Sequence, residues 1–184
     1  MLWAAACLCF FGFMRAGEIV IPTDSSYDSE LHLSYGDVRL VCPSNPSGLE
    51  VSLKSSKTDP FRLGVTIVVG RTNSPVGLCA VVANVSYMVA RGDSSGPYFQ
   101  FGDGRSLTRA RFVQAVRAAL LAVGVSPAGY SGHSFRIGGA TTAAAQGVSE
   151  ALIKTMGRWQ SAAYLLYVRT PREQLLQVAR VLIQ

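Results

Sequence analysis

The residues of this sequence best suited to chemistry lie in the segment SGHSFRIGGATTAAAQG, residues 131–147. His133 and Arg136 are three residues apart, so on a helix their side chains share a face. An imidazole can accept a proton near neutral pH, and a guanidinium is permanently charged and binds phosphate oxygens in pairs. Taken alone, such a pair is more often a hydrogen-bonded histidine beside an unrelated arginine.

Two segments upstream add basic side chains. FFGFMRAGEI places Arg15 at the end of an apolar helix, with Glu18 three residues on as an orienting partner or a helix ion pair. Arg15 could also simply extend its charge from the end of a buried helix into water. In the turn KSSKTDP, Lys57 and Lys54 compete for the same role, and either could be an ordinary turn lysine.

Downstream, GRWQSAAYLLYVR contains Trp159, Tyr164 and Tyr167. The indole supplies an N–H donor and a packing surface, although most tryptophans are core aromatics. The two tyrosines are three residues apart and share a helix face, so one of them is expected to serve packing.

These four segments, in this order, resemble the tyrosine recombinase (phage integrase) family over about residues 10 to 170. They look closest to the recombinases of eukaryotic mobile elements such as Cryptons and DIRS-like retrotransposons, in which HSFR and GRW…Y variants are typical. Many members have nine residues between the His or Trp and the tyrosine, whereas Trp159 and Tyr167 are eight apart. Tyr164 therefore competes as nucleophile, but YVR matches the end of the motif and favours Tyr167. The resemblance implies the following catalytic residues: Arg15, Lys57, His133, Arg136, Trp159 and Tyr167.

The implied reaction is DNA integration or site-specific recombination, with strand cleavage and rejoining through a 3′-phosphotyrosine. Arg15 and Arg136 would stabilise the charge of the transition state without a metal, and the phosphotyrosine link conserves bond energy, so no cofactor is expected. A tyrosine hydroxyl, with a pKa of about 10, needs activation, for which His133 is the candidate base. Lys57 would protonate the departing 5′-oxygen. The alternative is a non-catalytic DNA-binding or interaction remnant of a mobile element.

The charge distribution favours a polyanionic partner. Residues 1–91 hold seven Lys and Arg against seven Asp and Glu, and residues 92–184 hold ten against four, so the net charge of +6 lies in the second half. Double-stranded DNA is the expected partner, and members of the family act as synaptic tetramers. Lys54, Arg109 and Arg111 are expected DNA contacts, with a solvated helix face as the alternative for the two arginines.

The periodicity of apolar residues predicts one mostly helical α+β domain with a small antiparallel sheet inserted early. Ser131 and Ser149 are the expected N-caps of their helices, and Gly147 a helix end. The last helix could dock into a neighbouring subunit or pack within its own. The expected strands are 37–41, 49–54 and 62–69, and the expected helices 2–19, 76–90, 107–124, 131–147, 149–156, a short one on SAAYLLYVR, and 172–183.

The remaining features concern the ends of the chain and its compartment. Residues 1–184 are expected to be a catalytic domain truncated at its N-terminus, without the core-binding domain that usually precedes Arg15. The 14 apolar residues at the start lack the cationic lead of a signal peptide and are too short to span a bilayer, so we expect a buried helix.

The four cysteines predict neither disulfides nor zinc. The expected location is the nucleus for a eukaryotic protein and otherwise the cytoplasm, with neither secretion nor a membrane.

Overall fold

The computed structural model describes residues 1–54, 64–73, 77–93 and 95–169. Its elements in chain order are α1 (Leu2–Phe11), α2 (Ala16–Ile19), the 3₁₀ helix η1 (Tyr35–Asp37), β1 (Val38–Val41), β2 (Gly48–Leu53), β3 (Val65–Gly70), α3 (Ala80–Arg91), α4 (Arg109–Ala122), η2 (Pro127–Gly129), α5 (Ser134–Ala145), α6 (Glu150–Gly157) and η3 (Ala162–Leu166). The predicted α+β class is confirmed. The helix predicted over 172–183 lies outside the described residues.

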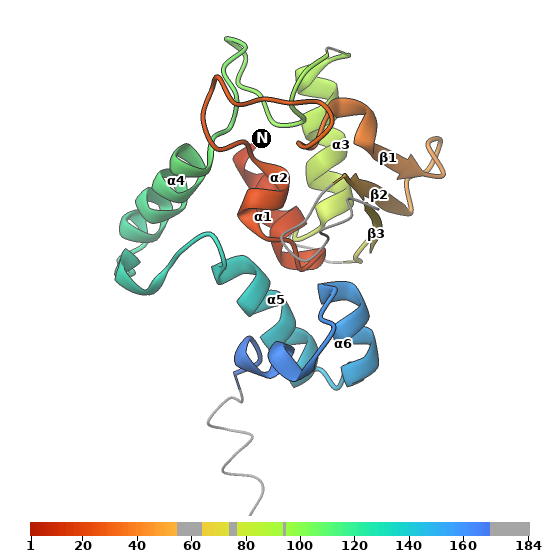
Figure 1. Cartoon of the computed structure of the whole chain (residues 1–184), viewed down its shortest axis with the longest axis vertical. Helices are drawn as coiled ribbons and strands as arrows, with labels where there is room; N and C mark the ends of the chain where they lie inside the picture. The colour runs from red at the N-terminus through yellow and green to blue at the C-terminus, as the bar shows by residue number, and fades with distance from the viewer. Residues whose placement is uncertain (55–63, 74–76, 94, 170–184) are drawn as a thin grey trace, which may run out of the picture.

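Helix α1 lies at the centre of the molecule, with α3 and the sheet to one side and α5 and α6 below it (Figure 1). The prediction of one helix from residue 2 to 19 is wrong, because α1 ends at Phe11 and α2 starts at Ala16. Between them Phe13 has a φ of +47°. The break sends two neighbouring side chains into different cores: Phe13 packs with Ala140 of α5, and Met14 enters the main core.

The three strands form a small antiparallel sheet, as predicted, and their order in it is β1-β2-β3. Val51 of β2 pairs with Val38 of β1 and with Ile67 of β3. Alternate residues of β2 and β3 are buried in the main core and their neighbours are exposed, which is the period of two expected for a sheet covered on one face. Helix α3 contacts β2 and β3.

The helices after the sheet follow the predicted order with shifted starts. Helix α3 begins at Ala80 rather than at 76, because Cys79 is extended and forms its N-cap. The Oγ1 atom of Thr108 caps α4 by accepting a hydrogen bond from the backbone N–H of Arg111. Between α3 and α4, Gln100 and Ser106 form an isolated antiparallel bridge.

The two predicted N-caps have different outcomes. Ser149 caps α6 as expected, its Oγ accepting from the N–H of Leu152. Ser131 is not the N-cap of α5, because the helix starts three residues later and His133 takes that position. The side chain of Ser131 instead accepts a hydrogen bond from the N–H of His133, inside a turn that precedes the helix.

The small residues of α5 allow α1 to approach closely. A Cβ atom on Gly139 would lie 2.2 Å from the carbonyl oxygen of Phe10, and one on Gly138 would lie 3.5 Å from the Phe10 ring. The contact joins the main core to a second, smaller core built from the end of α1, α5, α6 and η3. Among the described helices, none combines the length and the apolar character that a membrane span requires.

Candidate active site

The break between α1 and α2 places Arg15 at the N-cap of α2 rather than inside a helix. Its backbone N–H donates to Oε2 of Glu18 and its Nη1 donates to Oε1, and each hydrogen bond is 2.8 Å long. The predicted pairing with Glu18 is therefore confirmed. Of the three guanidinium nitrogens of Arg15, Nη1 forms this hydrogen bond within the described chain. Nε and Nη2 are therefore available to another acceptor.

Arg136 is fully buried, on the face of α5 that meets the end of α1. One Nη atom donates to the carbonyl oxygen of Phe13 and the other to that of Gly157, so the guanidinium joins the α1–α2 break to the end of α6. Burial and, after it, the charges of Arg15 and Arg158 lower the pKa of Arg136 to about 10, although the charge of Glu18 opposes the shift. The group is still charged at neutral pH.

Trp159 covers the guanidinium of Arg136, with its ring centroid 4.2 Å from the Cζ atom, which is the geometry of a cation–π contact. The indole lies against both candidate nucleophiles: its centroid is 5.3 Å from that of Tyr167 and 6.4 Å from that of Tyr164. The ring also approaches that of Phe13. Trp159 is therefore both a core aromatic and a wall of the site.

The two tyrosines have different surroundings. Tyr164 is only 3% exposed and packs in the smaller core, and its side-chain hydrogen bond to Glu150, together with burial, raises its pKa. Tyr167 is half-buried, with its ring centroid 5.6 Å from the Cζ atom of Arg136. The hydroxyl of Thr141 on α5 donates to the carbonyl oxygen of Tyr167, which ties this segment to the helix that carries Arg136.

His133 lies among positive charges. Burial lowers its pKa below the ordinary 6.5, and the charges of Arg109, Arg15 and Arg136 lower it further, whereas Glu18 opposes them. The imidazole is therefore neutral at pH 7 and can accept a proton. Its Nδ1 atom is buried and has no hydrogen-bond partner in the part of the chain that the structure describes.

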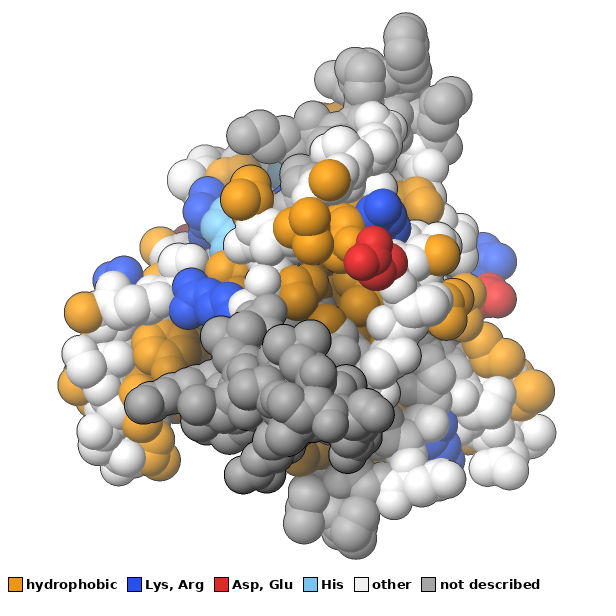
Figure 2. Space-filling model, turned by 90° about the horizontal axis from the view of Figure 1, so that it is seen from below, with side chains coloured by type: hydrophobic (Ala, Val, Ile, Leu, Met, Phe, Trp, Pro, Cys, Tyr) orange, Lys and Arg blue, Asp and Glu red, His pale blue; other side chains and the backbone are white. Residues whose placement is uncertain are grey.

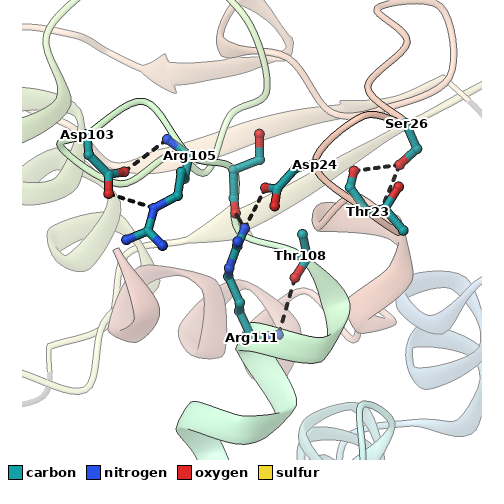
Figure 3. A network of polar contacts seen from close by, with 8 residues as sticks. Thr23, Asp24, Ser26, Asp103, Arg105, Thr108 and Arg111 are labelled. Atoms are coloured by element: carbon teal, nitrogen blue, oxygen red, sulfur yellow. Dashed lines mark hydrogen bonds and ion pairs between the residues drawn. The ribbon is translucent and has the colours of Figure 1, made fainter.

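Arg109 and Arg111 are both in the first turn of α4 but have different surroundings. Arg109 is exposed and near the site, where a Cβ on Gly132 would lie 3.9 Å from its Nε atom. Nη1 of Arg111 forms a 2.5 Å ion pair with Asp24 and also donates to the carbonyl oxygen of Ser106 (Figure 3). Of the two, Arg109 is the one placed beside His133.

Lys54, one of the two predicted lysines, lies apart from this group. Lys57 is outside the described residues, so its position is not compared. Nζ of Lys54 pairs with Asp37 over 2.8 Å and donates to the carbonyl oxygen of Ser29, on a cavity at the edge of the sheet that Glu30 and Thr66 also line. Lys54 is thus bound to a carboxylate at a different place in the fold.

Sequence reasoning missed Arg158, which directly precedes Trp159. Its side chain is buried and pairs through Nη2 with Oε2 of Glu18 over 2.7 Å. Two guanidinium groups, those of Arg15 and Arg158, therefore pair with one carboxylate, and the charge of that carboxylate also acts on Arg136. Only the local spacing of Arg15 and Glu18 was readable, because Arg158 and Glu18 are 140 residues apart.

The site has donors that the described protein does not satisfy. Nε of Arg136, Nε of Arg158 and Nε1 of Trp159 are buried without a partner in the described residues. Buried donors of this kind are normally hydrogen-bonded, so the two that belong to Arg136 and Trp159, beside Tyr167, fit an anion rich in acceptor oxygens. On the face of the molecule viewed from below Figure 1, where α5 and α6 lie, Lys and Arg side chains lie beside a histidine (Figure 2). Among the described residues, no group of three or more His, Cys, Asp or Glu is placed to hold a metal ion.

The fold is similar to that of solved DNA recombinases. The post-cleavage complex of the XerH site-specific recombinase with a palindromic difH substrate superimposes with a TM-score of 0.67 at 14% sequence identity, covering 98% of this chain and 45% of that one. The pre-cleavage complex of XerH gives 0.61 at 14% identity, with coverages of 98% and 46%. The Tn1549 transposon integrase in complex with circular intermediate DNA gives 0.53 at 13% identity, with coverages of 98% and 56%.

These neighbours are tyrosine recombinases and integrases, and this chain has the fold of their catalytic domain. It spans about half the length of these solved proteins. No protein family model matches the sequence, and no curated protein matches it.

Proposed function

We propose that this chain cleaves and rejoins double-stranded DNA through a 3′-phosphotyrosine intermediate, with Tyr167 as the nucleophile. The observation that carries the proposal is the meeting of side chains from separate segments: Tyr167 and Trp159 lie against the guanidinium of Arg136, and the charges of Arg15 and Arg136 act on His133. The neighbouring XerH and Tn1549 integrase structures are complexes with DNA, which supports the same partner here.

In the proposed reaction, the hydroxyl oxygen of Tyr167 attacks the phosphorus and forms the Tyr–O–P bond, while the bond from phosphorus to the 5′-oxygen breaks. His133, neutral at pH 7, accepts the tyrosine proton. Lys57 protonates the departing 5′-oxygen, as the family resemblance implies. Rejoining is the reverse, with the 5′-hydroxyl as nucleophile and tyrosine as leaving group, so no external energy source is consumed.

Arg15 stabilises the charge on the non-bridging oxygens through Nε and Nη2. Arg136 joins it by exchanging at least one backbone carbonyl for a phosphate oxygen, and its unpartnered Nε faces no competing acceptor within the described chain. Loss of one such preorganised donor lowers the rate about 10²- to 10³-fold in other enzymes. Because the donors are already charged, the reaction needs no metal.

The segments HSFR and GRW…Y further support a place among recombinases of eukaryotic mobile elements. We also propose that the protein acts on DNA as a homo-oligomer, as tyrosine recombinases do. The observation that would favour a non-catalytic DNA-binding remnant instead is salt-sensitive DNA binding without cleavage.

The test uses a duplex with a nick close to the cleavage site, so that the short released fragment diffuses away and the covalent complex accumulates. We expect a protein–DNA adduct that survives denaturation and that Tyr167→Phe abolishes. Tyr164→Phe is the matched control and should retain the adduct. An adduct that persists in Tyr167→Phe and is lost in Tyr164→Phe would overturn the choice of nucleophile, and no adduct with any chain would overturn the proposed function.

A further inference from the structure

The backbone of Arg158 adopts a conformation that arginine does not favour. It follows α6 in the left-handed region, with φ 58° and ψ 39°, where glycine is the usual residue because a Cβ is strained there. The helix end itself is closed by backbone hydrogen bonds from the N–H groups of Arg158 and Trp159 to Thr155 and Lys154. Glycine could make the same bonds without strain, so the role of this residue lies in its side chain.

The side chain of Arg158 is buried and committed to two acceptors. Its exposed fraction is 12%, Nη2 donates to Oε2 of Glu18 over 2.7 Å, and Nη1 donates to the carbonyl oxygen of Met156 over 3.1 Å. Burial lowers its pKa, and the charge of Glu18 opposes that shift. A charge buried in this way needs its partner, so the contact with Glu18 is the one that keeps the guanidinium in place.

Glu18 is held from two sides. Oε1 accepts from Nη1 of Arg15, and Oε2 accepts both from the backbone N–H of Arg15 and from Nη2 of Arg158. The contacts with Arg15 are local, within one turn of α2. Arg158 is therefore the long-range contact that fixes the carboxylate relative to α6 and to the segment that carries Trp159 and Tyr167.

We propose that Arg158 is a positioning residue that acts on Arg15 through Glu18. By holding Oε2, it orients the carboxylate so that Oε1 binds Nη1 of Arg15 and leaves Nε and Nη2 directed to phosphate. The same contact ties the α2 end of the site to the end of α6, and so keeps the phosphate-binding arginine in register with the nucleophile Tyr167. This inference rests on the proposed function.

The first test measures the rate of adduct formation at saturating nicked DNA, and DNA affinity separately. Arg158→Ala should slow the reaction about 10- to 100-fold, because misplacement of a binding group by about 1 Å has effects of that size. DNA affinity should stay within about threefold, since the guanidinium is buried against protein. Arg158→Lys should recover part of the rate. Arg105→Ala, which removes an exposed arginine paired with Asp103, is the control and should leave the rate unchanged.

Arg158→Gly separates positioning from folding. Glycine relieves the left-handed backbone, so this variant should melt at a higher temperature than Arg158→Ala, yet lose adduct formation to the same extent. In a Glu18→Gln background, the further change Arg158→Ala should lower the rate of adduct formation less than threefold. The contact of Arg158 with the carboxylate of Glu18 is already lost in that background.

The outcomes distinguish the two proposals. If the unmodified chain forms no adduct, the proposed function fails, and this inference fails with it. If the unmodified chain reacts and Arg158→Ala reacts equally fast, only the inference is overturned. It is also overturned if Arg158→Ala loses DNA affinity rather than rate, or if its effect is fully retained in the Glu18→Gln background.

Discussion

Among the single residues, Arg136 has the most demanding position. Its guanidinium is fully buried, bridges the carbonyl groups of Phe13 and Gly157, and stacks on Trp159. A lysine cannot make two divergent hydrogen bonds and a planar stack at once, so this position requires arginine for structure as well as for phosphate chemistry. The same side chain thus joins the proposed phosphate-binding site to the indole ring beside Tyr167.

His133 leads to a prediction about pH. Its pKa is lowered below 6.5, so the acid limb of the rate of adduct formation should lie at a lower pH than an unshifted imidazole would give. Below its pKa the rate should fall about tenfold per pH unit, because the protonated imidazole cannot accept the tyrosine proton. Arg109→Ala removes one of the positive charges that depress this pKa, so the acid limb should move to higher pH. The measurement is the pH profile of the single-turnover rate.

The control for this profile is His133→Ala, which should react slowly and without that acid limb. A limb that keeps its position in His133→Ala would assign the titration to another group. A limb that moves to lower pH in Arg109→Ala would contradict the electrostatic origin of the shift.

Single residues also show what a sequence can and cannot reveal. The pairing of Arg15 with Glu18 is readable from their spacing, and so is the proximity of His133 to Arg136 on one segment. The ion pair between Arg158 and Glu18 is not readable, because it joins positions 140 residues apart that only the tertiary fold brings together. The sequence favours Tyr167 over Tyr164 through the YVR motif, whereas the difference in burial between the two side chains is not readable from their spacing.

Among the elements, the contact between α1 and α5 determines where Arg136 lies relative to the α1–α2 break that precedes Arg15. A Cβ on Gly139 would lie 2.2 Å from the carbonyl oxygen of Phe10, so the helices cannot keep their spacing with any larger residue. Gly139→Ala should reduce the free energy of unfolding by about 1–3 kcal/mol, as overpacking does elsewhere, and thermal or urea unfolding measures it.

Gly138→Ala is the matched control for this change. Its Cβ would meet the Phe10 ring at an ordinary 3.5 Å, and alanine is the better helix former by about 1 kcal/mol, so stability should be retained or rise. Equal destabilisation by the two substitutions would contradict the close approach of α1 to α5.

The order and type of the described elements were predictable, but the break between α1 and α2 was not. Apolar residues run without interruption from Met1 to Met14, which is the pattern of one buried helix. The helix ends at Phe11 because Phe13 and Met14 are buried in two different cores, a demand that the sequence pattern does not contain. The break is also what makes Arg15 an N-cap, so the error in the helix concealed a feature of the site.

For the whole molecule, the position of charge predicts how DNA binding responds to salt. Arg109 is exposed beside the site, whereas Arg111 is already paired with Asp24. Arg109→Ala should reduce the slope of log affinity against log salt concentration by about 1, as the loss of one phosphate contact does, and Arg111→Ala should reduce it less. Equilibrium binding of a duplex from about 50 to 200 mM salt measures both slopes. A larger change for Arg111→Ala would contradict the assignment.

The most direct test of the molecule as a DNA-cleaving recombinase is to identify the residue that becomes linked to DNA. The covalent complex is digested with nuclease and trypsin, and the modified peptide is fragmented in a mass spectrometer. Cleavage after Arg158 and Arg169 gives one peptide, WQSAAYLLYVR, that contains both candidate tyrosines. We expect the nucleotide remnant on Tyr167, with Tyr164 unmodified. A remnant on Tyr164 or on another residue, or no modified peptide, would contradict the account.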